Sequence, residues 1–183
     1  AAFYDYHNED GGIEYRQVRL QNFWLRKKEF RSQRLEAGKW FPNLDGVRRV
    51  PYGLVDVLSH PGEQVFLVEG EKDVDTLRGL GLLALTLSGG SSNRWERIEP
   101  FLVSRIFYGR DVVCLPDNDP PGLDYSAWCI EDLFLAAGSM RTVLLPGLGK
   151  GGDVTDWLAM GHTKAELIEE VGKTFTHVAI TLT

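Results

Sequence analysis

The sequence predicts an α/β fold, with a parallel sheet flanked by helices and a small, β-rich, basic amino-terminal part. Two patterns support this prediction. After residue 58, short apolar runs alternate with segments of helical periodicity, which is the order of a parallel sheet covered by helices. Near the start, aromatic and β-branched residues flank the turn signal "NEDGG", as in a hairpin over residues 3–20. We therefore expect an amino-terminal subdomain over 1–58, an α/β domain over 59–173, and a tail over 174–183 that the pattern does not place.

The amino-terminal part is basic, although the whole chain of 183 residues carries a net charge of −6. Residues 16–49 hold ten Lys or Arg and only three acids. Aromatic residues are interleaved with these charges, namely Phe23, Trp24, Phe30 and Trp40. Such interleaving suits a surface that follows a nucleic-acid backbone while stacking bases. The alternative, which is the commoner arrangement, is that the aromatics form a small core beneath a pair of strands.

Four apolar runs predict the strands of the parallel sheet, because each is short, apolar and bounded by polar or glycine residues. These runs are "VFLVE" (65–69), "LLALTL" (82–87), "DVVCLP" (111–116) and "RTVLLPG" (141–147). Helices are expected at "EKDVDTLRGLG" (71–81), near "RWERIEPFLV" (94–103), at "DYSAWCIEDLFLAAG" (124–138), at "DVTDWLAMG" (153–161) and at "KAELIEEVG" (164–172). The two prolines before residue 122 fit the first turn of a helix, where a missing N–H costs nothing. The tail "FTHVAITLT" alternates as a strand does, without a predicted partner.

Acidic residues follow three of the four predicted strands. They are Glu69 with Asp73, then Asp117 and Asp119, then Asp153 and Asp156. Because the carboxyl ends of parallel strands meet at one edge of a sheet, we expect these carboxylates to become neighbours. Oxygen ligands without His or Cys suit Mg²⁺ or Mn²⁺. An aspartate after a strand also commonly caps the next helix, and this alternative stays open for Asp119 and Asp153 taken singly.

Three segments, "VEGEKD", "LPDNDPPG" and "GKGGDVTDWL", resemble the signatures of the Toprim domain, a catalytic module shared by bacterial primases, topoisomerases and certain nucleases. Their order is most similar to that in the primases of phages, plasmids and other mobile elements. The upstream segments "YDYHNEDGG", "RKKEFRSQR" and "GKWFPNL" resemble the part that precedes Toprim in those proteins, so the resemblance covers nearly the whole chain. It implies a Toprim-like sheet, with residues 59–173 as the Toprim catalytic domain.

The resemblance also implies an activity: metal-dependent synthesis of RNA primers on single-stranded DNA during replication of a mobile element, by a nucleotidyltransferase. The catalytic residues would be Glu69, Asp117 and Asp119. The ligands of Mg²⁺ or Mn²⁺ would be Glu69, Asp73, Asp117, Asp119 and Asp153. Nucleic acid would be bound by the basic residues Arg26, Lys27, Lys28, Arg31 and Arg34. Lys72, Lys150 and Arg94 are further candidates for phosphate contacts, although no local pattern singles them out.

The expected partners are a single-stranded DNA template and ribonucleoside triphosphates, with a helicase and a zinc-binding module supplied in cis or in trans. Only Cys114 and Cys129 are present, without a CxxC pair, so this chain holds no cysteine-based zinc site. "LLPGLGKGG" lacks the first glycine and the Ser or Thr of a P-loop. No apolar run approaches about 20 residues and no secretory signal is visible, so we expect a cytoplasmic protein without a membrane partner. The start at Ala-Ala leads us to expect an excised fragment.

Two alternative functions remain open. One is a Toprim-type, metal-dependent nuclease, which uses similar carboxylates on a phosphodiester. The other is a non-catalytic nucleic-acid-binding module that keeps the fold. The "KGxD" segment and the basic upstream part favour a primase over a nuclease, and the intact set of Glu69, Asp117 and Asp119 disfavours an inactive domain.

Overall fold

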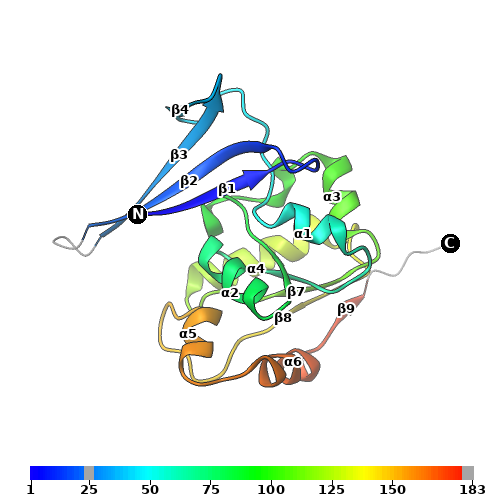
Figure 1. Ribbon diagram of the computed structural model, residues 1–183. Helices are drawn as coiled ribbons and strands as arrows, with labels where there is room; N and C mark the ends of the chain where they lie inside the picture. The colour runs from blue at the N-terminus through cyan, green and yellow to red at the C-terminus, as the bar shows by residue number, and fades with distance from the viewer. Residues whose placement is uncertain (23–26, 179–183) are drawn as a thin grey trace.

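A computed structural model describes residues 1–22 and 27–178 of the chain and shows two sheets, one above the other in Figure 1. The smaller sheet is antiparallel, with strand order β1-β2-β3-β4. The larger has the order β6-β5-β7-β8-β9, in which the first four strands are parallel and β9 runs antiparallel to β8. The predicted α/β class, with a β-rich amino-terminal part, is confirmed.

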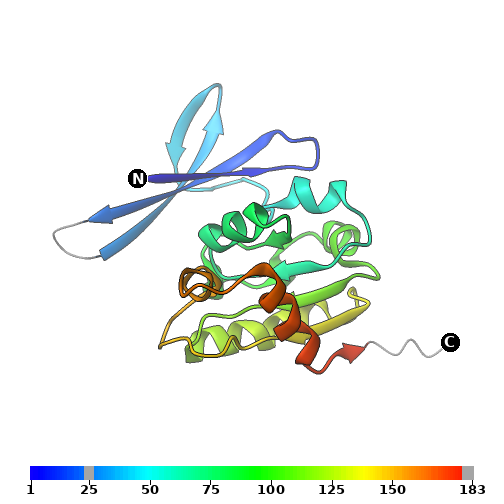
Figure 2. The same cartoon turned by 60° about the horizontal axis from the view of Figure 1, so that its bottom comes forward.

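The amino-terminal sheet consists of β1 (Ala2–His7), β2 (Ile13–Asn22), β3 (Lys27–Glu36) and β4 (Lys39–Pro42). The predicted hairpin is confirmed, since β1 pairs with β2 around a turn in which the Asn8 Oδ1 accepts hydrogen bonds from the backbone N–H groups of Asp10 and Gly12. Because Asn side chains readily close such turns, the "NEDGG" signal fixes the hairpin. Figure 2 shows this sheet lying across one side of the α/β domain.

The core beneath this sheet is built from tyrosines rather than from the aromatics of the basic segment. Tyr4, Tyr6 and Tyr15 are buried and belong to the same apolar cluster as the α/β domain. Phe30 is 54% exposed and Trp40 is half-buried, with the Arg16 guanidinium 4.1 Å from its ring centre. The core interpretation is therefore wrong for Phe30. In the register of β2 and β3 this side chain lies opposite Arg19, on the same face as Tyr15 but beyond the tyrosine cluster, where it lines a cleft. Phe23 and Trp24 lie outside the described residues.

The larger sheet is buried on both faces, as its apolar strands predicted. Its strands are β5 (Val65–Leu67), β6 (Leu83–Leu85), β7 (Asp111–Cys114), β8 (Ser139–Thr142) and β9 (His177–Val178). One face packs against α1 (Leu54–Ser59), α3 (Pro100–Phe107) and α4 (Pro120–Leu133). The other packs against α2 (Glu71–Gly79), α5 (Val154–Ala159) and α6 (Lys164–Lys173).

Several boundaries differ from the prediction for identifiable reasons. Helix α4 begins at the prolines because Asp119 caps it, and its last turn is followed by a bridge between Ala137 and Tyr108. Strand β8 begins and ends before the predicted 141–147, because its register with β7 pairs Asp111 with Ser139. The stretch near 94–103 divides into one short 3₁₀ turn, Trp95–Arg97, and the start of α3, which begins at a proline. Another 3₁₀ turn, Gly90–Ser92, lies in the loop before it.

The proposed boundary at residue 58 stays a prediction, and α1 crosses it. Part of the tail is placed, because β9 pairs with β8, whereas residues 179–183 lie outside the described part. Cys114 and Cys129 are free and buried. Among the described residues, no helix combines the length and the apolar character that crossing a membrane requires.

Candidate active site

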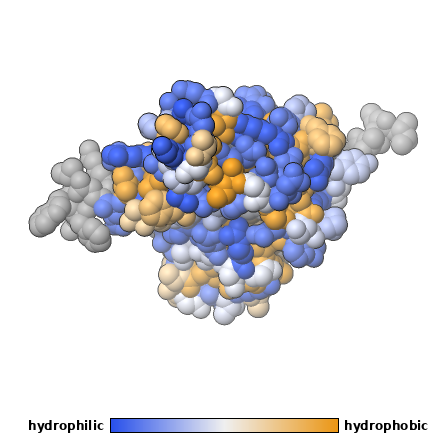
Figure 3. Space-filling view, turned by 45° about the horizontal axis from the view of Figure 1, so that its top comes forward, coloured by the Kyte–Doolittle hydropathy of each residue, from blue (hydrophilic) through white to orange (hydrophobic). Residues whose placement is uncertain are grey.

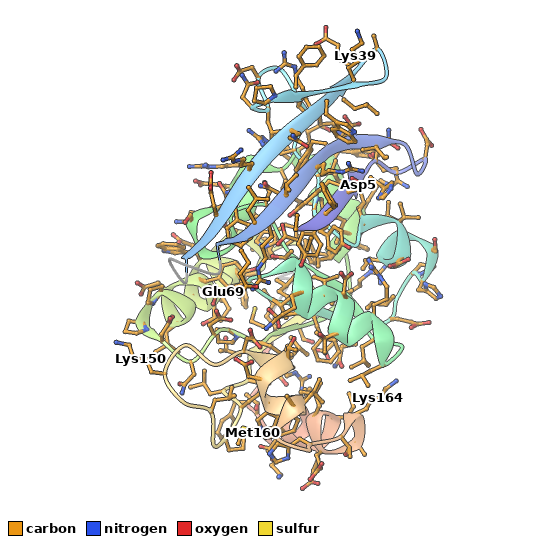
Figure 4. The ribbon with its side chains drawn as sticks, turned by 60° about the vertical axis from the view of Figure 1, so that its left-hand side comes forward. Asp5, Lys39, Glu69, Lys150, Met160 and Lys164 are labelled. Carbon is orange, nitrogen blue, oxygen red and sulfur yellow. The ribbon has the colours of Figure 1, made fainter. Side chains whose placement is uncertain are left out.

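A cleft of about 340 Å³ lies at the carboxyl ends of β5 and β7, beneath the amino-terminal sheet. Four of the predicted carboxylates line it: Glu69, Asp73, Asp117 and Asp153. From the other side, β2 and β3 contribute Arg19 and Phe30, which face each other in the register of the two strands. Figure 4 shows Glu69 below the ends of these strands. The topology therefore brings together acids that are distant in sequence and adds a cation and an aromatic ring from the small sheet.

Glu69 and Asp117 are held together by the backbone. The Asp117 N–H donates a hydrogen bond to the Glu69 Oε1 at 2.9 Å. Gly122, in the first turn of α4, allows this approach, because a Cβ at this position would collide with the Asp117 carbonyl and the Glu69 carboxylate. The glycine of "DNDPPG" is thus required by packing within the site.

Asp119 and Asp153 are helix caps as well as members of the acidic cluster. The Asp119 Oδ1 accepts from the Gly122 N–H at the start of α4, and the Asp153 Oδ1 accepts from the Asp156 N–H at the start of α5. Each capping hydrogen bond fixes the carboxylate at a rigid helix end and uses only its Oδ1 oxygen. The capping interpretation is therefore correct for both residues. Asp156 completes a capping box with Asp153 and does not line the cleft.

A second group of contacts joins α2 to α5. The Lys72 ammonium lies 2.5 Å from the Asp153 Oδ2 and 3.8 Å from the Asp73 Oδ1. The Thr155 hydroxyl donates to the Asp73 Oδ1 at 2.5 Å and lies 2.9 Å from the Thr76 hydroxyl. These contacts hold Asp73, whose side chain is almost fully buried, at the wall of the cleft.

The electrostatics of the cleft are those of crowded acids. Burial, followed by repulsion from Glu69, raises the pKa of Asp117 to about 7. Burial raises the pKa of Asp73 to about 6, against the hydrogen bond from Thr155. Burial alone would raise the pKa of Asp153, but the hydrogen bonds from Lys72 and from the Asp156 N–H, together with the charge of Lys72, hold the pKa of that carboxyl below its ordinary value. Asp117 has no cationic partner among the described residues.

The donor set fits Mg²⁺ or Mn²⁺. All the acidic side chains offer oxygen. The raised pKa of Asp117 reflects burial, followed by repulsion from the neighbouring carboxylates, and a bound divalent ion would offset both. Within residues 1–22 and 27–178, no three His, Cys, Asp or Glu side chains already surround a single point. Mg²⁺ commonly binds through one or two carboxylates together with water and substrate phosphates, so an open arrangement suits it. Glu69 and Asp117, with Asp119 beside them, are the residues that would hold it.

Of the predicted nucleic-acid-binding residues, Arg31 and Arg34 do not line this cleft. Arg26 lies outside the described residues, as do the side chains of Lys27 and Lys28. Arg31 is exposed and pairs with Glu29, and Arg34 donates to the Pro42 carbonyl and to Asn43. Seen from this side in Figure 3, the surface is largely hydrophilic with apolar patches between.

A second pocket, of about 280 Å³, adjoins the cleft at Gly89. It lies between β2, β3 and the "SGGSSN" loop, and three arginines line it: Arg49, Arg94 and Arg97. Among the described residues that line it there is no acid. Arg94 forms ion pairs with Glu131 and Asp132 on α4. Its guanidinium therefore serves a structural contact and is not a free phosphate-binding group. The two pockets thus differ sharply in charge.

Sequence reasoning missed three members of the site. Glu71 is buried and accepts a hydrogen bond from the Tyr6 hydroxyl at 2.7 Å, which ties β1 to α2. Arg19 was counted only within the basic segment, and Thr155 was not singled out. No local pattern marks Thr155, whereas the alternation of β2 and β3 would have placed Arg19 beside Phe30 once their register was known.

Comparison with known proteins gives likenesses of structure only. No family model matches the chain, and no curated protein matches its sequence. The fold is similar to the primase fragment of the bacteriophage T7 primase-helicase protein, with a TM-score of 0.58 and 18% identity over 92% of this chain and 62% of that one. It is also similar to the zinc-binding and RNA polymerase domains of the Aquifex aeolicus primase, with a TM-score of 0.63 and 18% identity over 94% of this chain and 40% of that one.

A third similar structure contains primase domains of bacteriophage T7 bound to an RNA/DNA hybrid and dTTP, interacting with the lagging-strand DNA polymerase; the TM-score is 0.60, with 17% identity over 94% of this chain and 76% of that one. At these identities the likeness shows a primase-type fold. The chain spans about three fifths of the T7 fragment and two fifths of the Aquifex chain.

Proposed function

We propose that this chain is the Toprim-type catalytic core of a DNA primase of a mobile element, which makes RNA primers on single-stranded DNA with Mg²⁺ or Mn²⁺. One observation carries the proposal: carboxylates from three separate segments line one cleft that Arg19 and Phe30 cover from the amino-terminal sheet. The likeness to primase fragments supports it, because those structures share both the α/β domain and the sheet in front of it.

In the proposed reaction, the 3′-hydroxyl of a primer or first nucleotide attacks the α-phosphorus of an incoming ribonucleoside triphosphate. The new O–P bond forms as the bond to pyrophosphate breaks, and Glu69 accepts the hydroxyl proton. A bound divalent ion would supply charge stabilisation at the attacking and leaving oxygens. The protein holds Glu69 and Asp117 in one orientation through the Asp117 N–H, and the capped ends of α4 and α5 present Asp119 and Asp153 on rigid backbone.

The charge of the two pockets favours a primase over a nuclease. Beside the acidic cleft, the second pocket offers Arg49 and Arg97, neither of which has a carboxylate partner in the described part of the chain. A polymerase must hold the phosphates of an incoming triphosphate as well as those of the template, and this pocket provides donors for them. A nuclease needs only the strand that it cuts.

The proposed partners are single-stranded DNA and ribonucleoside triphosphates, together with a helicase and a zinc-binding module in cis or in trans. The T7 structures concern a primase-helicase protein and primase domains on an RNA/DNA hybrid, and the Aquifex structure includes a zinc-binding domain. These partners are carried over to this chain as part of the proposal, with a cytoplasmic location.

A single assay separates the candidate functions. Single-stranded DNA, labelled ribonucleotides and a supercoiled plasmid are incubated with Mg²⁺ or Mn²⁺ and the wild-type chain. The Asp117→Asn/Asp119→Asn variant removes two site carboxylates, and Asp124→Asn, an exposed residue of α4, is the matched control. Short labelled products that only the double variant fails to make would support the primase. Nicked plasmid without such products would support the nuclease, and DNA binding without either product would support the non-catalytic module.

A further inference from the structure

Phe30 is an aromatic ring in a cleft whose other described walls are charged or bare. The remaining described residues that line the cleft are acids, Arg19, Lys72 and glycines, so Phe30 is the one apolar side chain among them. It is 54% exposed. A single exposed phenylalanine on a protein surface needs no explanation. What distinguishes Phe30 is its position over the candidate active site.

The small sheet fixes the ring at this position. In the register of β2 and β3, Phe30 lies opposite Arg19, and Ser32 lies opposite Gln17. Strand residues two apart share a face, so one face of this ribbon lines both the cleft and the pocket beside it. The Ser32 hydroxyl donates to the Oε1 of the buried Gln17 at 3.0 Å. The ring therefore stands on paired strands, next to a cross-strand hydrogen bond.

The faces of the Phe30 ring are uncovered, unlike those of its neighbours in the sheet. The Arg16 guanidinium lies 4.1 Å from the ring centre of Trp40, and that of Arg34 lies 5.4 Å from the ring centre of Phe41. In the described part of the chain, no aromatic ring or cation lies over Phe30. Phe30 thus offers a π-face to a planar group.

The cleft has the size and the chemistry for the planar part of a nucleotide. Its volume of about 340 Å³ lies within the range of about 300–1,000 Å³ that is common for small-ligand sites. Gly70, Gly89 and Gly90 supply stretches of wall without side chains. A nucleobase is flat and uncharged, so the carboxylates of the cleft do not repel it. Stacking on an aromatic ring also suits every base, because each base has a π-face.

We infer that Phe30 is the platform on which a nucleobase stacks in the cleft, so that the sugar and phosphate of that nucleotide lie toward the carboxylates. This inference rests on the function proposed above and assigns Phe30 a substrate-binding role within it. The base belongs either to a free ribonucleotide or to the end of a nucleic-acid strand, and the test has one arm for each source.

The fluorescence of 2-aminopurine tests the inference without an activity assay, because stacking on an aromatic ring quenches it. The full chain with Mg²⁺ is titrated into 2-aminopurine ribonucleoside triphosphate in one arm. In the other arm it is titrated into a single-stranded oligonucleotide that ends in 2-aminopurine. Equilibrium dialysis measures binding of the same probes independently of quenching.

The variants separate the ring from its apolar bulk. Phe30→Tyr keeps the ring, whereas Phe30→Leu keeps an apolar side chain without it. Phe3→Leu is the matched control, because Phe3 is 59% exposed on the same sheet but does not line the cleft. Circular dichroism checks folding, and Phe30→Met replaces Phe30→Leu if the latter does not fold.

We expect quenching of the bound probe in the wild type, Phe30→Tyr and Phe3→Leu, in the arm that carries the natural source of the base. In Phe30→Leu we expect binding at least about fivefold weaker, with the bound probe unquenched even at saturation. A bound probe that Phe30→Leu quenches as fully as the wild type would overturn the inference, as would equal affinities in the two proteins.

Failure of the inference differs from failure of the proposed function. If the wild type binds a probe without quenching it, or makes primers exactly as Phe30→Leu does, the inference fails and the proposed function stands. If the wild type binds neither probe in dialysis, the proposed function fails first, and the inference fails with it.

Discussion

Asp117 is a carboxylate that the fold places where its charge is disfavoured. Its pKa of about 7 means that the folded chain retains a proton there which the unfolded chain, with an ordinary carboxyl near 3.8, has already lost. Between these two values the native state binds more protons, so the free energy of unfolding falls as the pH rises through about 7. We predict that Asp117→Asn, in EDTA, stabilises the protein by about 1–2 kcal/mol at pH 8 and by little at pH 4, after allowance for solvent screening.

Thermal unfolding of both chains from pH 4 to pH 8 checks this prediction, with Asp124→Asn as the control. Added Mg²⁺ should reverse the order at pH 8, because an ion that binds only the folded wild type stabilises it by mass action. A wild type that remains more stable than Asp117→Asn at pH 8 in EDTA would show that Asp117 has a partner which the described residues do not supply.

Gly122 is a residue whose missing side chain shapes the site. A methyl group there would collide with the backbone carbonyl of Asp117 and with the side-chain carboxylate of Glu69. We predict that Gly122→Ala lowers the free energy of unfolding by about 1–3 kcal/mol, as overpacking typically does, and lowers primer synthesis at least as far as Asp117→Asn. Gly149→Ala is the control, because a Cβ there meets no atom within 4 Å. Equal stability and activity in the two alanine variants would contradict the prediction.

The positions of most site carboxylates were predictable from the sequence. Asp119 and Asp153 each had two interpretations, as a cap or as a member of an acidic cluster, and the structure gives both at once. Because each acid follows a predicted parallel strand, and the carboxyl ends of such strands lie at one edge of the sheet, the sequence predicted that the acids converge. The contact of Lys72 with Asp153 joins residues 81 positions apart, and no local pattern encodes that distance.

At the scale of elements, the amino-terminal sheet is joined to α2 by a buried polar contact. The Tyr6 hydroxyl donates to Glu71, which is only 7% exposed, and the Tyr6 ring stacks on Tyr15 at 4.3 Å. We predict that Tyr6→Phe keeps the stacking but leaves the Glu71 carboxylate without its donor, which costs about 1–3 kcal/mol. Denaturant unfolding checks this value, with the exposed Tyr108→Phe as the control. A loss no larger than that of the control would show that water replaces the hydroxyl.

The elements themselves were largely predictable, and their ends were not. Apolar runs of five to seven residues identified four strands of the parallel sheet, and helical periodicity identified most of its helices. Strand β8 is displaced from its predicted range because pairing with β7, rather than the apolar run "VLL", sets its register. The short β9 was visible only as an alternation, since its partner is chosen by tertiary packing.

Across the whole molecule, positive and negative charge are separated by the fold. The acids meet in the cleft of the α/β domain, while many of the basic residues belong to the amino-terminal sheet, which lies above this domain in Figure 1. This separation was predictable from composition along the chain. The position of Arg19 in the cleft was not predictable in this way, because it depends on how the two sheets are set against each other.

The role of the basic segment is tested by the salt dependence of DNA binding. Reversing three charges in Lys27→Glu/Lys28→Glu/Arg31→Glu leaves Arg19, Phe30 and the cleft carboxylates unchanged. If these side chains contact phosphates, fewer counterions are released on binding, and the slope of log affinity against log salt should become shallower by about 0.7 per contact on single-stranded DNA. Fluorescence anisotropy with a labelled oligonucleotide, at about 50–300 mM salt, gives both the salt slope and the affinity. Lys173→Glu on α6 is the control. Weaker binding with a shallower slope would place the template on β3. Wild-type slope and affinity would instead point to the arginines that line the two pockets, namely Arg19 in the cleft and Arg49 and Arg97 beside it.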